Sequence, residues 1–388
     1  MRSINPIRES CEMMMKNKWQ YRKIGDVCVV ERGSSPRPID QFITEDGGGI
    51  NWIKIGDTTE SMYITETAQK IKPEGMKKSR YVEPGDFLLS NSMSFGRPYI
   101  LKIDGCIHDG WLVLKDKDEI FDKRFLYYYL SSKATYQKFK HMAVGGVVNN
   151  LNSEMVRKID VPVPSKDEQM DTADLLDKIC NIISLRKREL NCLDDLIRAR
   201  FVEMFGDIRY EEKYQGIPLR RLCTTISGGT PSTKCSEYYE GNIPWISTVS
   251  LGPNYIDGST AKGYITQEAI DNSATKLIPA GNILFGTRVG VGKSSINDVA
   301  LCINQDIVAI VGIDKNRFNV LFIKYVLDTY QSYYDSIKKG ATILGITGDD
   351  LKNTLIPVPP LELQNQFADF VKVVDKSKFT KTFGLLRC

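Results

Sequence analysis

The feature that most constrains this 388-residue chain is that its second half repeats the motifs of its first half in the same order. Residues 81–90 (YVEPGDFLLS) recur as residues 276–285 (KLIPAGNILF), and the VPVP segment at 161–164 recurs as IPVP at 356–359. Four further motif pairs match in order, and the offset stays between 192 and 197 residues throughout. This long-period repeat predicts two copies of one domain, over residues 18–165 and 217–360.

Each copy is predicted to be an α+β domain. Short β-rich runs bounded by Gly, Pro, Asp and Ser predict strands at 27–30, 52–55, 87–89, 111–114 and 308–311. Apolar residues on one helical face predict helices at 125–130 and 322–327. The Val-Pro segments cannot lie inside a helix, so they are expected to end each copy as extended chain.

Residues 166–205 contain neither Gly nor Pro, which predicts one long spacer helix between the copies. Its apolar residues recur at coiled-coil spacing with charged residues outside the seam, which favours a coiled coil over a buried core helix. A shorter second helix begins at residue 361 and is expected to give way to an irregular tail at Phe379. The partner-binding residues predicted on the two helices are Ile179, Ile183, Leu190, Leu193, Ile197, Met204, Phe367, Phe370 and Val374.

The remaining segments are an N-terminal extension (1–17), a linker (206–216) and the short helix with its tail (361–388). The sequence leaves open whether translation starts at Met1 or at one of Met13 to Met15. The extension has no apolar core typical of a signal peptide, and no apolar run is long enough to cross a bilayer. The nine cysteines are irregularly spaced without a Cys-x-x-Cys pair, which argues against a structural zinc site and favours free thiols in a reducing cytoplasm.

Motifs that would indicate catalysis are missing or incomplete. His108 and Asp109 lie near Cys106, but the matching position of the second copy reads Asn-Gln-Asp at 304–306, without a histidine. The TRVGVGKS string at 287–294 lacks the first glycine of a phosphate-binding loop. The chain also has no Asn-Pro-Pro-Tyr motif of DNA amino-methylation and no nuclease-like carboxylate cluster. We therefore expect no catalytic residues and no bound metal in this chain.

Three polar, glycine-rich loops with basic or amide side chains recur at matching places in the two copies. Hydroxyl and amide groups contact DNA phosphates, while Arg and Asn read base edges, and glycine lets the backbone approach closely. The net charge of +4 is only mildly basic, so the loops rather than the whole surface would supply DNA affinity. The predicted DNA contacts are Ser35, Arg37, Asn91, Arg97 and Asn149 in the first copy, and Thr230, Lys234, Arg288, Lys293 and Thr342 in the second.

The duplicated layout, the VPVP and PVPPLELQ segments in front of helices, and the PGDFLLS segment resemble the specificity subunit of a type I restriction-modification system. The resemblance covers about residues 18–378. It implies that each repeat is a target recognition domain reading one half of a two-part DNA site. It also implies that the two helices pair as an antiparallel coiled coil, set the half-site spacing and dock two methyltransferase subunits.

The same resemblance implies a translocating nuclease subunit as a further partner. S-adenosylmethionine, ATP and Mg²⁺ would belong to the partner subunits, with no cofactor in this chain. Two features depart from the family pattern: the second helix is short, and residues 165–168 read SKDE where the family usually has Pro-Leu-Glu-Glu. Half-length subunits of this family dimerise, so the short helix makes self-association an alternative.

Two other functions stay open from the sequence alone. One is a detached part of a restriction enzyme with its own nuclease or methyltransferase activity. The other is a scaffold that does not bind DNA, which would show no salt-dependent DNA affinity.

Overall fold

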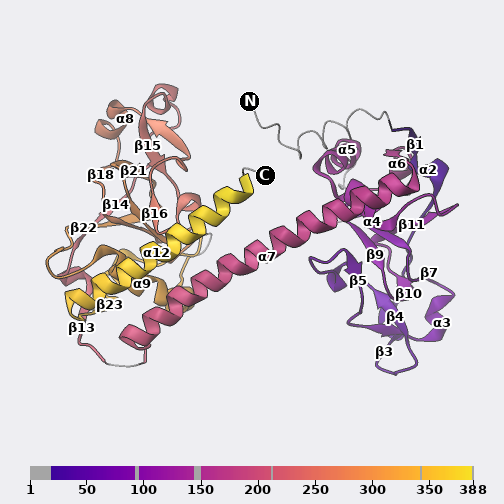
Figure 1. The fold of residues 1–388 in the computed structure, drawn as a ribbon, viewed down its shortest axis with the longest axis horizontal. Helices are drawn as coiled ribbons and strands as arrows, with labels where there is room; N and C mark the ends of the chain where they lie inside the picture. The colour runs from indigo at the N-terminus through magenta and orange to yellow at the C-terminus, as the bar shows by residue number, and fades with distance from the viewer. Residues whose placement is uncertain (1–18, 92–95, 144–149, 211–212, 341–342, 387–388) are drawn as a thin grey trace, which may run out of the picture. The chain divides into compact units, whose positions relative to one another are not determined.

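The computed structural model describes residues 19–91, 96–143, 150–210, 213–340 and 343–386, and the chain divides into two compact units, Met1–Arg186 and Lys187–Cys388. Figure 1 shows both units as sheets flanked by helices. The N-terminal extension, with the alternative start at Met13 to Met15, lies outside the described residues. The boundary between the units falls within helix α7 (Lys166–Phe205), so each unit is described by itself.

The first unit contains two five-stranded sheets and one strand pair. The first sheet has the order β2 (Cys28–Arg32), β11 (Trp111–Asp116), β8 (Phe87–Ser90), β9 (Pro98–Leu101) and β5 (Tyr63–Ile64). The second has the order β3 (Ile43–Thr44), β6 (Lys70–Ile71), β4 (Ile50–Ile53), β10 (Gly105–Ile107) and β7 (Arg80–Val82). The pair is β1 (Tyr21–Lys23) with β12 (Asp160–Pro162). A strand overlaps each of the four positions predicted in this copy. Residue 27 belongs instead to a helical turn (24–27) before β2, and β4 ends at Ile53, two residues before the predicted end.

Five helices precede α7 in the described part of the first unit: α2 (Ile24–Val27), α3 (Pro73–Met76), α4 (Lys123–Ser131), α5 (Lys133–Ala143) and α6 (Ser153–Arg157). Helix α4 corresponds to the helix predicted at 125–130. Its first turn is capped by Asp122, whose carboxylate accepts hydrogen bonds from the backbone N–H groups of Arg124 and Phe125. The buried face of α4 joins β2, β8 and β11 in one hydrophobic core.

The second unit repeats this topology. Its five-stranded sheet has the order β14 (Thr224–Ser227), β22 (Ile307–Val311), β19 (Ile283–Gly286), β20 (Ser294–Asn297) and β16 (Tyr255–Ile256). Its four-stranded sheet has the order β17 (Gly263–Ile265), β15 (Ile243–Ile246), β21 (Leu301–Ile303) and β18 (Leu277–Ile278), and β13 (Gly216–Pro218) pairs with β23 (Leu355–Pro357). The helices before α12 are α8 (Gln267–Asp271), α9 (Val320–Thr329), α10 (Gln331–Ile337) and α11 (Gly348–Lys352). The predicted α+β repeat is confirmed.

In each half of the chain a helix begins after the Val-Pro segment. The long helix predicted over residues 166–205 is α7 (Lys166–Phe205). The second, α12 (Leu361–Leu386), is longer than expected: the irregular tail predicted from Phe379 is wrong, because the helix continues to Leu386. Residues 379–386 contain no proline and only one glycine, so nothing in them breaks the helix.

Within the second unit, α12 lies antiparallel against the C-terminal part of α7. Lys378 forms an ion pair with Asp194 at 2.5 Å, whereas Phe367, eleven residues earlier, packs its ring 5.3 Å from that of Phe201. Higher residue numbers on one helix therefore face lower numbers on the other. Phe201 and Phe367 join Phe322 of α9 in the largest hydrophobic core of this unit.

Most of the predicted partner-binding residues pack within the second unit. Ile197, Phe367 and Val374 are buried, and Leu193, Met204 and Phe370 are partly buried against the same core. These six side chains lie in or against the core that α7 and α12 share, so they offer little surface to another chain. Ile179 and Ile183, by contrast, are 42% and 43% exposed, and Leu190 is half-buried. None of the helices in the described segments is both long and apolar enough to span a bilayer.

Candidate functional site

Each unit contains a tight β-turn in the same structural position. In the first turn, residues 108–111, the N–H of Trp111 donates to the carbonyl of His108 at 3.2 Å, and the N–H of His108 donates to Ile53 at 3.4 Å. In the second turn, residues 304–307, the N–H of Ile307 donates to the carbonyl of Asn304 at 3.1 Å, and Asn304 donates to Ile246 at 3.0 Å. The two turns are equivalent by backbone geometry, although their side chains differ.

The first glycine-rich loop is hydrogen-bonded to the turn in both units. The N–H of Gly33 donates to Trp111 at 2.9 Å, and that of Gly228 donates to Ile307 at 3.0 Å. A Cβ atom at Gly33 would lie 2.1 Å from the carbonyl oxygen of His108, and one at Gly228 would lie 2.0 Å from that of Asn304. Only glycine fits this close backbone approach.

The second loop binds the other side of each turn. The backbone N–H of Asn91 donates to Gly110 at 2.9 Å, and that of Thr287 donates to Asp306 at 2.8 Å. Both loops later pass through a glycine with positive φ, which is 79° at Gly96 and 86° at Gly292. The following residues, Arg97 and Lys293, therefore occupy matching positions, and both are exposed.

The third loop completes the arrangement. The N–H of Leu151 donates to the carbonyl of Asn91 at 3.0 Å, and that of Ile346 donates to Thr287 at 2.8 Å. Backbone hydrogen bonds thus gather the flanks of all three predicted loops around one turn in each unit. We call the turn and the described residues of its loops the first loop surface in one unit (residues 33–37, 91, 96–97, 108–110 and 150–151) and the second loop surface in the other (residues 228–234, 286–293, 304–306 and 343–346).

On the first loop surface, side chains converge on Asp109. Its carboxylate accepts a hydrogen bond from Ser35 Oγ at 3.1 Å and pairs with Arg37, whose side chain is 80% exposed, at 3.3 Å. Partial burial of Asp109 acts in the opposite direction, but the hydrogen bond from Ser35 and the charge of Arg37 lower the pKa of this carboxyl group. Asn91 is buried, and its side-chain amide donates to the backbone carbonyl of Asp109 at 2.8 Å. This residue, predicted as a DNA contact, therefore supports the turn from inside the domain.

On the second loop surface, Thr230 donates a short hydrogen bond to the side-chain oxygen of Gln305. Thr230, Lys234 and Arg288 are exposed, as predicted DNA contacts must be. Asn149 and Thr342, the contacts predicted in the third loops, lie outside the described residues.

His108 and Cys106 do not form a nucleophile and base pair. Burial lowers the pKa of the His108 imidazole, and its Nδ1 atom accepts a hydrogen bond from the backbone N–H of Gly110 at 2.6 Å. Cys106 is fully buried in a small core with Trp52, and burial raises the pKa of its thiol. A neutral, inaccessible thiol is not a competent nucleophile. His108 instead supports the first turn.

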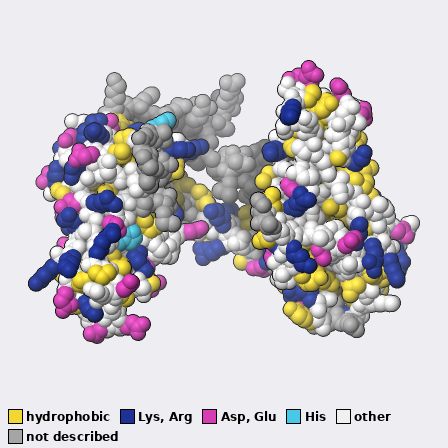
Figure 2. Space-filling view, turned by 180° about the vertical axis from the view of Figure 1, so that it is seen from behind, with side chains coloured by type: hydrophobic (Ala, Val, Ile, Leu, Met, Phe, Trp, Pro, Cys, Tyr) yellow, Lys and Arg dark blue, Asp and Glu magenta, His cyan; other side chains and the backbone are white. Residues whose placement is uncertain are grey.

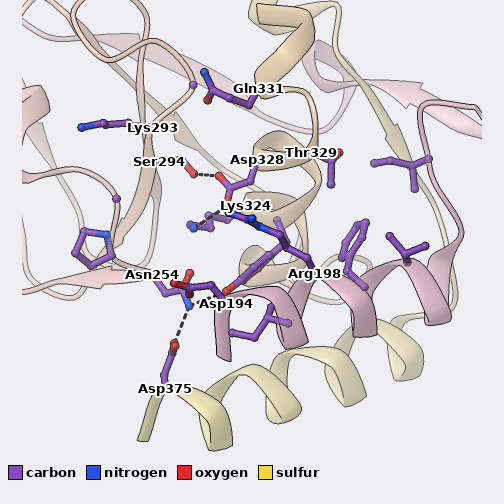
Figure 3. Close-up of a pocket in the computed structure, with 18 of the residues that line it drawn as sticks. Asp194, Arg198, Asn254, Lys293, Ser294, Lys324, Asp328, Thr329, Gln331 and Asp375 are labelled. Carbon is purple, nitrogen blue, oxygen red and sulfur yellow. Dashed lines mark hydrogen bonds and ion pairs between the residues drawn. The ribbon is translucent and has the colours of Figure 1, made fainter. Parts of the chain in front are cut away.

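The second unit also contains a cavity of about 1360 Å³, lined by α7, α9, α10, α12 and the loops at 206–209, 252–254 and 292–293 (Figure 3). Its buried Lys324 pairs with Asp328 at 2.7 Å, and Asp328 accepts a hydrogen bond from Ser294 at 2.7 Å. Asn254 donates to Asp375 at 2.7 Å on the opposite wall. Because these charged walls are largely paired within the protein, they stabilise the α9–α12 region. Lys293 at the rim is shared with the second loop surface.

Charged side chains of both signs are interspersed over the visible face of each unit (Figure 2). This distribution agrees with the small net charge and shows no single basic face there. Within the described ranges, no group of His, Cys, Asp or Glu residues is arranged to hold a metal ion.

Sequence reasoning overlooked Asp109 and Gln305 as site residues. The signal that could have identified them is their equivalent position in the two copies, within the repeated motif order.

Comparison with known proteins shows which family the chain matches. A family model described as "Type I restriction modification DNA specificity domain" matches residues 16–194 and again 211–383. The specificity subunit of the Escherichia coli type I restriction enzyme EcoR124I/EcoR124II is 29% identical over 253 residues, which cover 60% of this chain and only 59% of that protein. The putative MjaX specificity subunit of Methanocaldococcus jannaschii is 23% identical, covering 92% and 87% of the two chains.

Two solved structures share the fold. One, from work on complex assembly and conformational transition of the type I R-M system, has a TM-score of 0.55 at 18% identity and covers 94% of this chain and 93% of that chain. The type I restriction-modification S subunit from M. genitalium has a TM-score of 0.53 at 14% identity and covers 96% and 93%.

Proposed function

Because the chain belongs to the family of type I restriction-modification specificity subunits and carries the family's DNA specificity domain twice, we propose that it is the non-catalytic subunit that reads a two-part DNA target. The first loop surface reads one half of the target and the second loop surface reads the other. The observation that carries this proposal is that matched backbone hydrogen bonds build the same surface twice, with different exposed side chains.

The chemistry of the exposed groups suits duplex DNA. Arg97 and Lys293 occupy equivalent exposed positions and would contact phosphates, while Arg37 and Arg288 would reach base edges or the backbone. One domain alone reads few base pairs, so two domains joined by a helical spacer gain specificity from a fixed separation.

The helices would supply the remaining functions. In this proposal α7 and α12 set the spacing between the half-sites and dock two methyltransferase subunits, and a translocating nuclease subunit joins the complex. S-adenosylmethionine, ATP and Mg²⁺ would bind to those partner subunits. We place the protein in the cytoplasm, where the host DNA to be methylated is found.

The proposal is tested by co-expressing the chain with the methyltransferase of its own system and sequencing methylated DNA. A methylated two-part motif that requires this chain is expected. Arg97→Ala should relax or weaken the first half of the motif, and Arg288→Ala should affect the second half. If both variants alter the same half, the two-reader arrangement is wrong; if the purified chain methylates or cleaves DNA alone, it is an enzyme instead.

A further inference from the structure

The two turns present different side chains from the same backbone position. Asp109 and Gln305 are each the second residue of their turn, and both side chains reach solvent, with that of Asp109 44% exposed. Each is held by a hydroxyl group of the first loop, Ser35 in one unit and Thr230 in the other. The protein therefore displays a carboxylate and a carboxamide in the same way at the centre of its two loop surfaces.

Neither side chain is needed to form the turn. Backbone groups of Gly33, Asn91 and Trp111 fix the first turn together with the side chains of Asn91 and His108, and the equivalent backbone groups fix the second turn. Both side chains also lie outside the hydrophobic cores. The side chains at positions 109 and 305 can therefore differ in order to recognise DNA, without affecting the turn.

A carboxylate on a DNA-facing surface is repelled by phosphates unless it accepts a hydrogen bond from a base. Asp and Glu accept from the exocyclic N4 amine of cytosine in the major groove. In the free protein the charge of Asp109 is balanced by Arg37 at 3.3 Å. Since the Arg37 side chain is largely exposed, it can turn to DNA and leave one carboxylate oxygen available.

The carboxamide of Gln305 offers a different pattern. Its oxygen accepts from Thr230, and its nitrogen has no acceptor within the described part of the chain. Glutamine can pair with both N6 and N7 of adenine, donating from the nitrogen and accepting at the oxygen.

We propose that Asp109 and Gln305 are the matched base-reading positions of the two domains, with Asp109 selecting cytosine in one half of the target and Gln305 selecting adenine in the other. This inference rests on the proposed DNA-reading function. It adds the residue on each loop surface that reads a base and the base that it selects. Ser35 and Thr230 act as positioning residues that fix the orientation of the reading side chain.

The test uses the full chain assembled with its methyltransferase and a duplex library in which both half-sites are randomised. Bound duplexes are recovered and sequenced for the wild type, Asp109→Asn and Gln305→Glu. Both variants keep the oxygen that accepts the hydroxyl hydrogen bond. Asp109→Asn should reduce the preference for cytosine at one position of the first half by roughly 5- to 100-fold. Gln305→Glu should shift one position of the second half from adenine to cytosine.

Matched controls separate base reading from a change in surface charge. Asp118→Asn and Gln215→Glu make the same chemical changes at exposed positions away from the loop surfaces, and should leave both halves unchanged. If the wild type selects no two-part sequence, the proposed function itself fails. If the wild type selects a two-part sequence, the present inference alone is overturned by either of two results. The two reading variants could keep the wild-type preferences, or they could lose affinity for all sequences to the same extent.

Discussion

The side-chain oxygen of Gln364 accepts a hydrogen bond from the backbone N–H of Asn319 at 2.9 Å, across 45 residues of sequence. Asn319 is the N-cap of α9, so Gln364 at the start of α12 holds the start of another helix. The amide nitrogen of Gln364 donates to the carbonyls of Pro359 and Arg317. In the first unit Gln169 makes the same contact with the N-cap residue Asp122, at 2.8 Å. The glutamine that follows each Val-Pro segment is thus a buried clamp between two helices.

Replacing this clamp should destabilise the second unit. Gln364 is fully buried, and Gln364→Leu removes the hydrogen-bond partner of one backbone N–H and two carbonyl groups, which we expect to cost about 2–4 kcal/mol. Urea unfolding measures the loss. Gln366→Leu is the matched control on the exposed face of α12 and should change stability by less than about 0.5 kcal/mol. Equal effects of the two variants would contradict the clamp.

The contact between α7 and α12 depends on an aromatic cluster. Phe201 is buried and packs its ring 5.3 Å from Phe367 and 5.1 Å from Phe205. Phe201→Ala should cost about 3–5 kcal/mol, because the removed ring leaves a cavity between helices. The neighbouring Val202 is 50% exposed, so Val202→Ala is a control with little expected effect. Denaturant unfolding of both variants checks the difference.

The stability of the first unit should depend on the protonation of His108. Burial lowers the pKa of the folded-state imidazole below its usual value of 6.5, with Lys54 acting in the same direction and Asp109 and Asp57 opposing it. Below pH about 6.5 the unfolded chain therefore binds more protons than the folded chain, so stability falls as the pH decreases towards the folded-state pKa.

Thermal unfolding between pH 7.5 and 5.5 measures this dependence. We expect His108→Asn, which introduces the residue found at position 304, to reduce the loss of Tm on acidification, whatever its effect at pH 7.5. His141 is exposed, and His141→Asn should keep the wild-type slope. A slope unchanged by His108→Asn would show that other groups control the pH dependence.

The exposed apolar residues of α7 provide a test of methyltransferase docking. Ile179 and Ile183 lie on one helix face, four residues apart, and are more than 40% exposed. The double variant Ile179→Ser, Ile183→Ser should fold with little loss of stability but reduce co-purification of the methyltransferase at least several-fold. Val373→Ser, at a 70% exposed position of α12, controls for loss of a surface apolar group. Full co-purification of the double variant would argue against docking at this face.

Most of the fold could be predicted because its determinants are local. The bounds of α7 follow from forty residues without a helix breaker, and its seam follows from the spacing of apolar residues. The repeated strand order follows from motifs that recur at a constant offset. The irregular tail predicted from Phe379 was wrong, because residues 379–386 contain no proline that would end the helix.

The candidate site was only partly predictable. The three loops carry recognisable glycines, but the turns that join them share no residue type at equivalent positions, since His-Asp-Gly stands in one and Asn-Gln-Asp in the other. Their equivalence lies in backbone hydrogen bonds between segments far apart in sequence. Likewise, the apolar pattern of Ile197 and Phe367 marks a packed face without saying whether the packing partner is the same chain or another one.

The glycines at 33 and 228 have a consequence for how such a protein can diverge. Because they fix the turn through main-chain atoms, a substitution at position 109 or 305 alters what the surface offers without disturbing what holds it in place. A substitution at either position should then change DNA affinity with little effect on folding stability, and the effects of substitutions at both positions should add. A mutation can therefore change the DNA sequence recognised by one half of the molecule with almost no loss of stability, while the other half keeps its own preference.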